Sequence, residues 1–264
     1  MIMNTILIFT RNISIELFKL KRSFAFWLTI IGASFIPLIY FIYYALKYKS
    51  LIPADDVNPW DNFLTIQIMS AASLLIPLFI VLITSLIIQI EHKANAVKFV
   101  FTQPMPKWSI YFSKLLSVIG MIVFTYALFF MMMVISGKAA GTLHHELGLL
   151  SHSPNLSQPL KLLFRSFIAS MGIVSIQFWI SFRFKNFIVP LGIGIVLVIT
   201  GLIVFQAEES VYFPYAYNRL SLFLLASEKG QMAWFPNISL FSLIYFIAFS
   251  ILGYLDISKI NIKY

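Results

Sequence analysis

Few side chains in this sequence combine the residue types and the spacing that catalysis requires. His144, His145 and Glu146 are adjacent, but a zinc protease motif of the form H-E-x-x-H needs a second histidine one helical turn later, where this chain has Leu149. Together with His152 these residues leave weak metal binding open, while histidines solvated in a loop are the simpler interpretation. The sequence contains no cysteine, which excludes disulfides, thiol catalysis and thiolate metal sites.

Two other pairs of residues match fragments of intramembrane hydrolase motifs. Glu208 and Glu209 match the paired glutamates of membrane proteases that cleave prenylated proteins, but Phe213 occupies the position where that motif has arginine. Ser136 precedes Gly137 without the upstream glycine of a rhomboid-type nucleophile. Nucleophilic catalysis by serine also needs an adjacent base, and no serine has a histidine partner expected at membrane depth. We therefore expect no enzymatic active site in this chain.

Most of the rest of the chain consists of long apolar segments. Six of them lack charged residues and are long enough to cross a bilayer, which takes about 17–25 apolar residues. Backbone polar groups in lipid must be hydrogen-bonded within the segment, so each segment is expected to be a helix. The predicted spans are residues 24–46, 63–90, 115–136, 166–182, 187–205 and 238–255. The predicted fold class is all-α, with one polytopic membrane domain over residues 1–264.

Composition and charge support a membrane protein with both termini in the cytoplasm. The chain is 60% hydrophobic and 11% charged, whereas soluble domains are about 25% charged. If the amino terminus is cytoplasmic and the spans alternate, the full net charge of +9 lies on the cytoplasmic side, as the positive-inside rule requires. Nucleic-acid binding would need cations interleaved with aromatic residues in a soluble domain, so no nucleic acid is expected as a partner.

The residues before the first span have the pattern of an amphipathic helix. Ile13, Leu17, Leu20 and Phe24 recur at helical spacing, with Phe18 beside them. The other side is polar and contains Asn12, Glu16, Lys19 and Arg22. This pattern predicts an interface helix that lies at the membrane surface and turns into the first span. It serves either as an anchor alone or also as a surface that packs against a cytoplasmic partner.

Residues 91–114, between the second and third spans, predict a short helix followed by a turn. Ala94, Val97 and Phe101 recur at i, i+3 and i+7 and form one apolar face. Pro104 is expected to end this helix, because the residue before a proline disfavours the helical conformation. Pro106 stiffens the turn that follows. A basic interfacial loop is the alternative interpretation of this segment.

The predicted connections on the outer side differ in character. Residues 47–62 contain Pro53 and Pro59 and are expected to form an ordered turn. Residues 137–158 are rich in glycine, serine and histidine and predict a mobile loop. Residues 206–237 do not form a span, yet residues 211–225 are dense in aromatic and apolar side chains. We expect short helices there, packed at the outer membrane surface.

The segment around residue 100 resembles the ABC-2 class of ABC transporter permeases. The matching features are an acidic residue at the end of the second span, a short helix, a Thr-x-Pro turn and a Lys-Leu-Leu opening of the third span. In this chain they are Glu91, residues 93–101, Thr102-Gln103-Pro104 with Pro106 and Lys107, and Lys114-Leu115-Leu116. The N-terminal helix, the six-span layout and the aromatic outer segment also match. Within the class, the chain is most similar to small six-span permeases of antimicrobial-peptide (lantibiotic) protection exporters.

The resemblance implies roles for two sets of residues and for several partners. The ATPase-coupling residues would be Glu91, Lys93, Ala94, Val97, Lys98, Phe101, Thr102, Pro104, Pro106 and Lys107. The interface helix would contain Ile13, Glu16, Leu17, Lys19, Leu20 and Arg22. Gly137-Lys138 is followed by Ala139, so the chain has no P-loop, and a separate cytoplasmic ABC ATPase would bind ATP and Mg²⁺. A second permease copy or a homologous permease is also implied, as is location in the bacterial cytoplasmic membrane.

An ATP-independent carrier, channel or scramblase is the alternative function. Ion-coupled carriers place ionisable residues within the membrane, and the predicted spans have none. Their larger polar residues are Gln67, Gln89 and Gln177. Pro37 and Pro77 lie in the middle of the first two spans and are expected to kink them, either as ordinary bends or as part of a substrate path.

Overall fold

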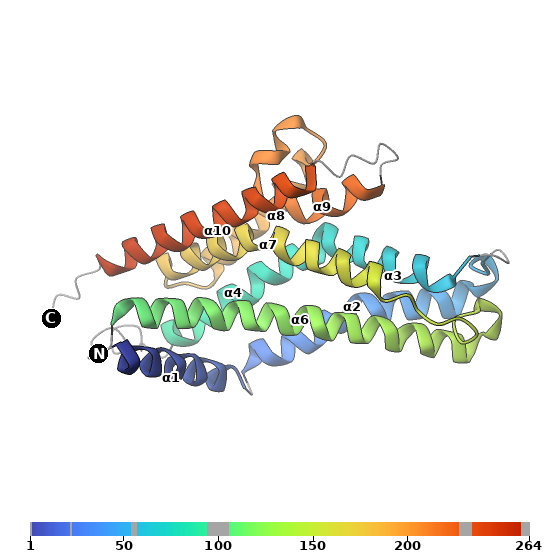
Figure 1. Cartoon of the computed structure of the whole chain (residues 1–264), viewed down its shortest axis with the longest axis horizontal. Helices are drawn as coiled ribbons and strands as arrows, with labels where there is room; N and C mark the ends of the chain where they lie inside the picture. Colours follow the sequence, from blue (N-terminus) through green and yellow to red (C-terminus); the bar gives the residue numbers. More distant parts are fainter. Residues whose placement is uncertain (1, 22, 54–56, 94–105, 227–233, 260–264) are drawn as a thin grey trace.

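The computed structural model describes residues 2–21, 23–53, 57–93, 106–226 and 234–259, and these residues form helices and turns with no strand. The helices gather into one elongated bundle (Figure 1), which confirms the predicted all-α fold. The α-helices are α1 (Ile2–Leu20), α2 (Phe24–Lys47), α3 (Pro59–Ser70), α4 (Ile76–Lys93), α6 (Lys107–Leu143), α7 (Ser157–Arg183), α8 (Ile188–Val204), α9 (Tyr217–Ala226) and α10 (Trp234–Ser258). The shorter helical segments are η1 (Tyr48–Ser50), the π-helix η2 (Ala71–Leu75), η3 (His145–Leu147), η4 (Glu208–Tyr212) and η5 (Pro214–Ala216).

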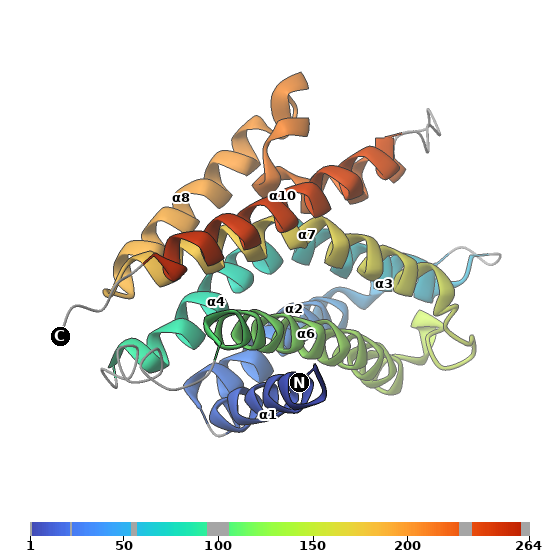
Figure 2. The same cartoon turned by 60° about the vertical axis from the view of Figure 1, so that its left-hand side comes forward.

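Within the described residues, five helical stretches are long and apolar enough to cross a membrane. They are Phe24–Ser50, Pro59–Ile90, Lys107–Leu143, Ser157–Arg183 and Ile238–Ser258. The apolar helix α8 has 17 residues, the lower limit of about 17 for a span. Successive long helices run in alternating directions (Figures 1 and 2), and α1 lies at the same end as the last turn of α10. The chain is therefore a polytopic membrane protein. We call this end the α1 end and the opposite one the far end.

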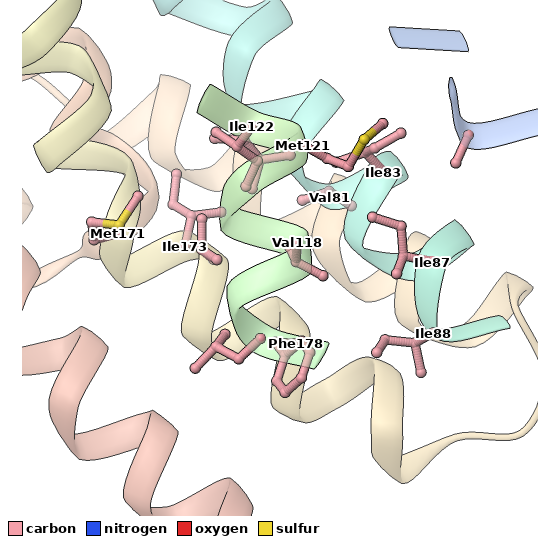
Figure 3. Packing of buried hydrophobic residues seen from close by; sticks show 14 of the residues in the cluster. Val81, Ile83, Ile87, Ile88, Val118, Met121, Ile122, Met171, Ile173 and Phe178 are labelled. Atoms are coloured by element: carbon pink, nitrogen blue, oxygen red, sulfur yellow. The ribbon is translucent and has the colours of Figure 1, made fainter. Parts of the chain in front are cut away.

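Helix α7 is the centre of the bundle. It packs against α4, α8, α9 and α10, and 67% of its most apolar stretch is buried, against 22% for α10. A cluster of buried apolar side chains fills the space between α4, α6 and α7 (Figure 3) and includes Val81, Ile83, Val118, Ile122, Ile173 and Phe178. Because lipid is as apolar as these side chains, close packing rather than transfer from water holds the helices together.

A proline disturbs the second span where α3 becomes α4. The helix continues from Pro59 to Lys93 but widens into the π-helix η2 just before Pro77. Pro77 has no backbone N–H, and its ring would clash with the Ser73 carbonyl one turn earlier. The wider π-turn accommodates that ring. The predicted disturbance at Pro77 is thus present. Pro37 lies inside α2, which runs from Phe24 to Lys47, and its predicted kink stays a prediction.

Capping residues set the starts of α2 and α3. The Ser23 side chain accepts a hydrogen bond from the N–H of Phe26, and the Asn58 side chain accepts one from the N–H of Trp60. Both side chains cap first-turn N–H groups, which have no carbonyl four residues earlier within the helix. Pro59 occupies the first turn of α3, a position that needs no N–H donor. These caps define the turn from α1 into the first span and the turn before the second.

The loop predicted at residues 137–158 is shorter and more fixed than expected. Helix α6 continues to Leu143, and α7 begins at Ser157. In the residues between them, the carbonyls of Leu149 and His152 accept hydrogen bonds from Trp60 Nε1 at 2.9 and 3.0 Å. The prediction of a mobile loop was therefore wrong. It rested on the glycine, serine and histidine content of the segment, which gives no information about hydrogen bonds from a tryptophan in another helix.

The aromatic segment before the last span forms short packed helices, as predicted. Segments η4, η5 and α9 follow α8, and Tyr215, Ala216 and Tyr217 are buried. Gly201 of α8 allows this close approach, since a Cβ atom there would lie 2.7 Å from the Tyr215 carbonyl oxygen. Burial raises the pKa of the Tyr215 hydroxyl above its ordinary value, so the hydroxyl stays protonated at neutral pH.

Candidate coupling site between α1 and α6

The structure describes the borders of the segment predicted to bind an ATPase. Glu91 and Lys93 lie in the last turn of α4, Pro106 is the N-cap of α6, and Lys107 is its first residue. Lys107 Nζ donates a hydrogen bond to the Ser258 carbonyl at 3.0 Å, which ties the start of α6 to the end of α10. The other predicted coupling residues lie outside the described residues; they are Ala94, Val97, Lys98, Phe101, Thr102 and Pro104.

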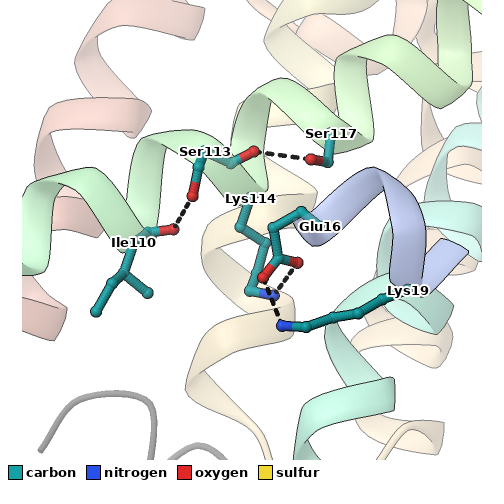
Figure 4. A network of polar contacts seen from close by, with 6 residues as sticks. All are labelled: Glu16, Lys19, Ile110, Ser113, Lys114 and Ser117. Carbon is teal, nitrogen blue, oxygen red and sulfur yellow. Dashed lines mark hydrogen bonds and ion pairs between the residues drawn. The ribbon is translucent and has the colours of Figure 1, made fainter. Parts of the chain in front are cut away.

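A buried ion pair joins α1 to α6 about two turns after α6 begins. Lys114 Nζ lies 2.7 Å from Glu16 Oε2, and Lys19 Nζ lies 2.7 Å from Oε1 of the same carboxylate (Figure 4). The side chains of Lys114 and Glu16 are only 2% and 10% exposed. Removing one member of such a pair leaves a buried charge, at a cost of about 3–5 kcal/mol. The pair therefore holds α1 in a fixed register on α6.

Two further contacts extend this connection toward the start of both helices. Asn12 Nδ2 donates a hydrogen bond to Ser109 Oγ at 2.9 Å, and the ring centroids of Phe9 and Trp108 are 5.5 Å apart. Phe9, Asn12 and Glu16 recur at spacings of three and four, so they share one face of α1. We call the whole contact the α1–α6 joint; it consists of Phe9, Asn12, Glu16, Lys19, Trp108, Ser109 and Lys114.

The predicted interface helix presents its two faces to different surroundings. The polar residues Asn12 and Glu16 are buried against the bundle, whereas Leu17 is 46% and Phe18 77% exposed. Outward apolar residues suit a helix at a membrane surface, where the surroundings are hydrocarbon. Of the remaining predicted residues, Ile13 is half-buried, Leu20 is buried, Lys19 is exposed and Arg22 lies outside the described residues.

A second polar contact ties helices together at the α1 end. Arg183 Nη1 donates hydrogen bonds to both carboxylate oxygens of Asp256 at 2.8 and 2.9 Å. Trp179 Nε1 donates to Asp256 Oδ2 at 3.2 Å. These contacts join α7 to α10, and Lys107 joins α10 to α6. The α1 end is therefore cross-linked by polar side chains, including the ion pairs of Glu16 with Lys114 and of Arg183 with Asp256.

The histidines that suggested metal binding lie at the far end. The His144 ring stacks on the Tyr48 ring with centroids 3.8 Å apart, and His144 Nε2 lies 3.0 Å from the Ala45 carbonyl oxygen. His152 Nδ1 lies 3.0 Å from the Gly148 carbonyl oxygen. Both rings thus contact neighbouring groups of the fold. Among the described residues, no three metal-binding side chains come together.

The fold and this joint define the class of protein: a polytopic all-α membrane protein whose N-terminal helix is fixed to a long membrane-spanning helix. A family model described as "ABC-2 family transporter protein" matches residues 12–201, which covers most of the chain. The chain therefore belongs to the ABC-2 transporter family, and its resemblance to ABC-2 permeases is confirmed. No curated protein and no solved structure matches the chain significantly. Family membership implies a permease that works with ABC ATPase subunits.

Proposed function

We propose that this chain is the transmembrane permease subunit of an ATP-driven exporter in the bacterial cytoplasmic membrane. A separate cytoplasmic ATPase would bind ATP and Mg²⁺, and a second copy or a homologous permease would complete the transporter. The substrate is an amphipathic molecule such as a peptide, a drug or a lipid-like compound. Resemblance to lantibiotic protection exporters favours antimicrobial peptides. The α1–α6 joint is the observation that carries this proposal, beside family membership.

The joint lies where the movement of a bound ATPase would enter the membrane domain. Helix α6 begins at Lys107, the last of the predicted coupling residues. Slack between α6 and its neighbours would absorb a small displacement before it reached the spans. The buried pair of Glu16 and Lys114 removes that slack, because separating the two charges in a low-dielectric site is costly. Helices α1 and α6 are therefore expected to move as one unit.

Helix α6 is long enough to carry such a displacement through the membrane. Its 37 residues extend about 55 Å at 1.5 Å per residue. Along this length α6 packs against α2 and, near the far end, against α3. At Gly137 a Cβ atom would lie 2.5 Å from the Trp60 ring, so the far end of α6 is closely packed. Movement at the coupling segment would thus reach the packing of Gly137 against Trp60 at the far end.

The test is co-purification of the ATPase with variants of the coupling segment. Phe101→Asp is expected to weaken ATPase binding by about tenfold or more, because burial of phenylalanine contributes about 1.5–3 kcal/mol and 1.4 kcal/mol is a factor of ten. Phe99→Asp is the matched control. It makes the same change in the same segment, two residues from Phe101 and therefore off the predicted apolar face of Ala94, Val97 and Phe101.

Two further measurements make the result decisive. His152→Ala at the far end is expected to leave ATPase binding intact, and membrane insertion of each variant is measured separately. Equal co-purification for Phe101→Asp, Phe99→Asp and the unmodified chain, with transport unchanged, would show that residues 94–105 are only an interfacial loop. The proposal would then lose the coupling step on which it depends.

A further inference from the structure

A groove lies between the half of α2 toward the far end and the later residues of α3. Its volume is about 440 Å³, and its lining residues are Ile36, Ile39, Tyr40, Tyr43, Ile66 and Ser70. This volume falls within the range of about 300–1,000 Å³ that is typical of small-molecule sites. We call it the α2–α3 groove. It lies away from the α1–α6 joint, and neither the coupling residues nor the joint contribute to it.

The groove lies on helices that can span a bilayer. Both walls belong to stretches that can span a bilayer, and only 28% of the most apolar stretch of α2 is buried in the bundle. Ile39, Tyr43 and Ile66 are 43%, 41% and 38% exposed on the protein. The groove therefore opens toward the hydrocarbon of the bilayer, where the available ligands are molecules with alkyl chains.

The groove contains a pair of hydroxyl groups that can form hydrogen bonds. Tyr40 Oη and Ser70 Oγ are 2.7 Å apart and hydrogen-bonded across the groove from α2 to α3. A hydroxyl can both donate and accept, so the pair retains capacity for a ligand hydroxyl or carbonyl. All six lining residues are uncharged, and a charged group within the membrane is costly without a partner. The groove therefore favours an uncharged head group.

The wall of the groove also borders a smaller cavity. Ile36 lines both the groove and a cavity of about 40 Å³ between α2, η2 and α6, whose walls include Gly32, Ala71 and Tyr126. The π-helix η2 begins at Ala71, the residue after Ser70. Single π-turns inside α-helices are frequent at functional sites.

We infer that the α2–α3 groove binds a single-chain, uncharged amphiphile from the bilayer. The alkyl chain lies along Ile36, Ile39 and Ile66, and the hydroxyl or carbonyl head hydrogen-bonds to the pair of Tyr40 and Ser70. The site follows from this chain and the membrane alone. If the proposed transport function also holds, the groove is where a lipid-like substrate enters the permease from the side.

The test uses the purified full-length chain in phospholipid nanodiscs and a monoacylglycerol with a photoreactive diazirine in its acyl chain. After irradiation, peptide mass spectrometry is expected to place the adducts on residues 35–44 and 63–71. Ile39→Trp fills the groove and is expected to reduce these adducts by about tenfold, because a filled site does not accept further volume. Leu38→Trp is the matched control, since Leu38 is exposed on the same helix but does not line the groove.

A second probe tests the head group. It has the same acyl chain with a phosphate monoester in place of the glycerol, and it is expected to label the groove about fivefold less because its charge has no partner there. Combined Tyr40→Phe and Ser70→Ala substitutions should remove most of the preference for the uncharged probe, while the chain remains bound.

Two results would overturn the inference. Adducts spread evenly over lipid-facing residues and unaffected by Ile39→Trp would indicate contact with bulk lipid only. A cross-link between two copies of the chain at the groove residues, in place of probe adducts, would assign the groove to a subunit interface. The assay contains neither ATPase nor ATP, so its failure is distinct from a failure of the proposed transport function.

Discussion

At the scale of single residues, Glu16 is the side chain on which the candidate site depends. Its carboxylate receives Lys114 from α6 and Lys19 from its own helix, both at 2.7 Å. The sequence predicted Glu16 on the polar side of an interface helix and placed Lys114 at the opening of the third span. It did not predict their contact, because they are 98 residues apart and no local pattern indicates such a partner.

Substitution of either charged residue of this pair should destabilise the protein. Reversal of both charges together should restore part of the lost stability. We expect Glu16→Gln to lower the free energy of unfolding by about 3–5 kcal/mol, because the buried ammonium of Lys114 loses the carboxylate that neutralises it. Lys114→Gln should lower it by less, because Glu16 keeps its ion pair with Lys19. Unfolding in detergent, followed by helical circular dichroism, measures the change. Glu146→Gln is the control, since Glu146 is exposed at the far end.

The pattern across these variants separates an ion pair from simple packing. With Glu16→Lys combined with Lys114→Glu, we expect a smaller loss than the sum of the two single reversals, since contacting residues are not additive. Additive losses would mean that the two charges do not stabilise one another, and the joint would then be held by Asn12 and Phe9 alone.

At the scale of helices, the sequence predicted which segments are helical better than where each begins and ends. The predicted fourth span began directly after Arg165, yet α7 begins at Ser157 and includes Lys161 and Arg165 in its first turns. Helix α6 similarly extends past both ends of the predicted segment 115–136. A helix continues beyond the hydrocarbon when lysine and arginine stems can reach the interface. Charge therefore marks the membrane boundary and not the helix boundary.

Two glycines of α8 give a matched test of how this short helix packs. A Cβ atom at Gly194 would lie 2.4 Å from Val81 Cγ1 of α4 and 2.6 Å from Gln177 Oε1 of α7, whereas one at Gly192 would have nothing within 4 Å. We expect Gly194→Ala to cost about 1–3 kcal/mol through overpacking. Gly192→Ala should be neutral or stabilise by up to about 1 kcal/mol, because alanine favours the helix.

Thermal unfolding of the two variants side by side measures this difference. Both carry the same substitution in the same helix, so membrane depth and helix propensity are nearly matched. Equal stability of Gly194→Ala and Gly192→Ala would mean that α8 does not sit against α4 and α7 as the structure places it.

At the scale of the whole molecule, charge and helix direction give the same arrangement by independent routes. The topology predicted from the sequence assumes a cytoplasmic amino terminus and spans that alternate in direction. Under that assumption the entire net charge lies on the cytoplasmic side. In the structure, successive long helices alternate in direction, and α1 and the end of α10 lie at the same end of the bundle (Figure 1). An even number of membrane crossings would place the two at the same end. Arg183 and Lys107 lie at that end, while His144 and His152 lie at the other. The α1 end is therefore expected to be cytoplasmic.

This orientation can be tested directly because the chain has no native cysteine. Ser153→Cys and Lys185→Cys are suitable positions, since both residues are exposed and lie in turns at opposite ends of α7. An impermeant thiol reagent added to intact cells should label Ser153→Cys and not Lys185→Cys, because α7 separates the two turns by the thickness of the membrane. After permeabilisation both should react, which confirms that both thiols are accessible. Labelling of Lys185→Cys in intact cells would place the α1 end outside, and the ATPase could then not reach the α1–α6 joint.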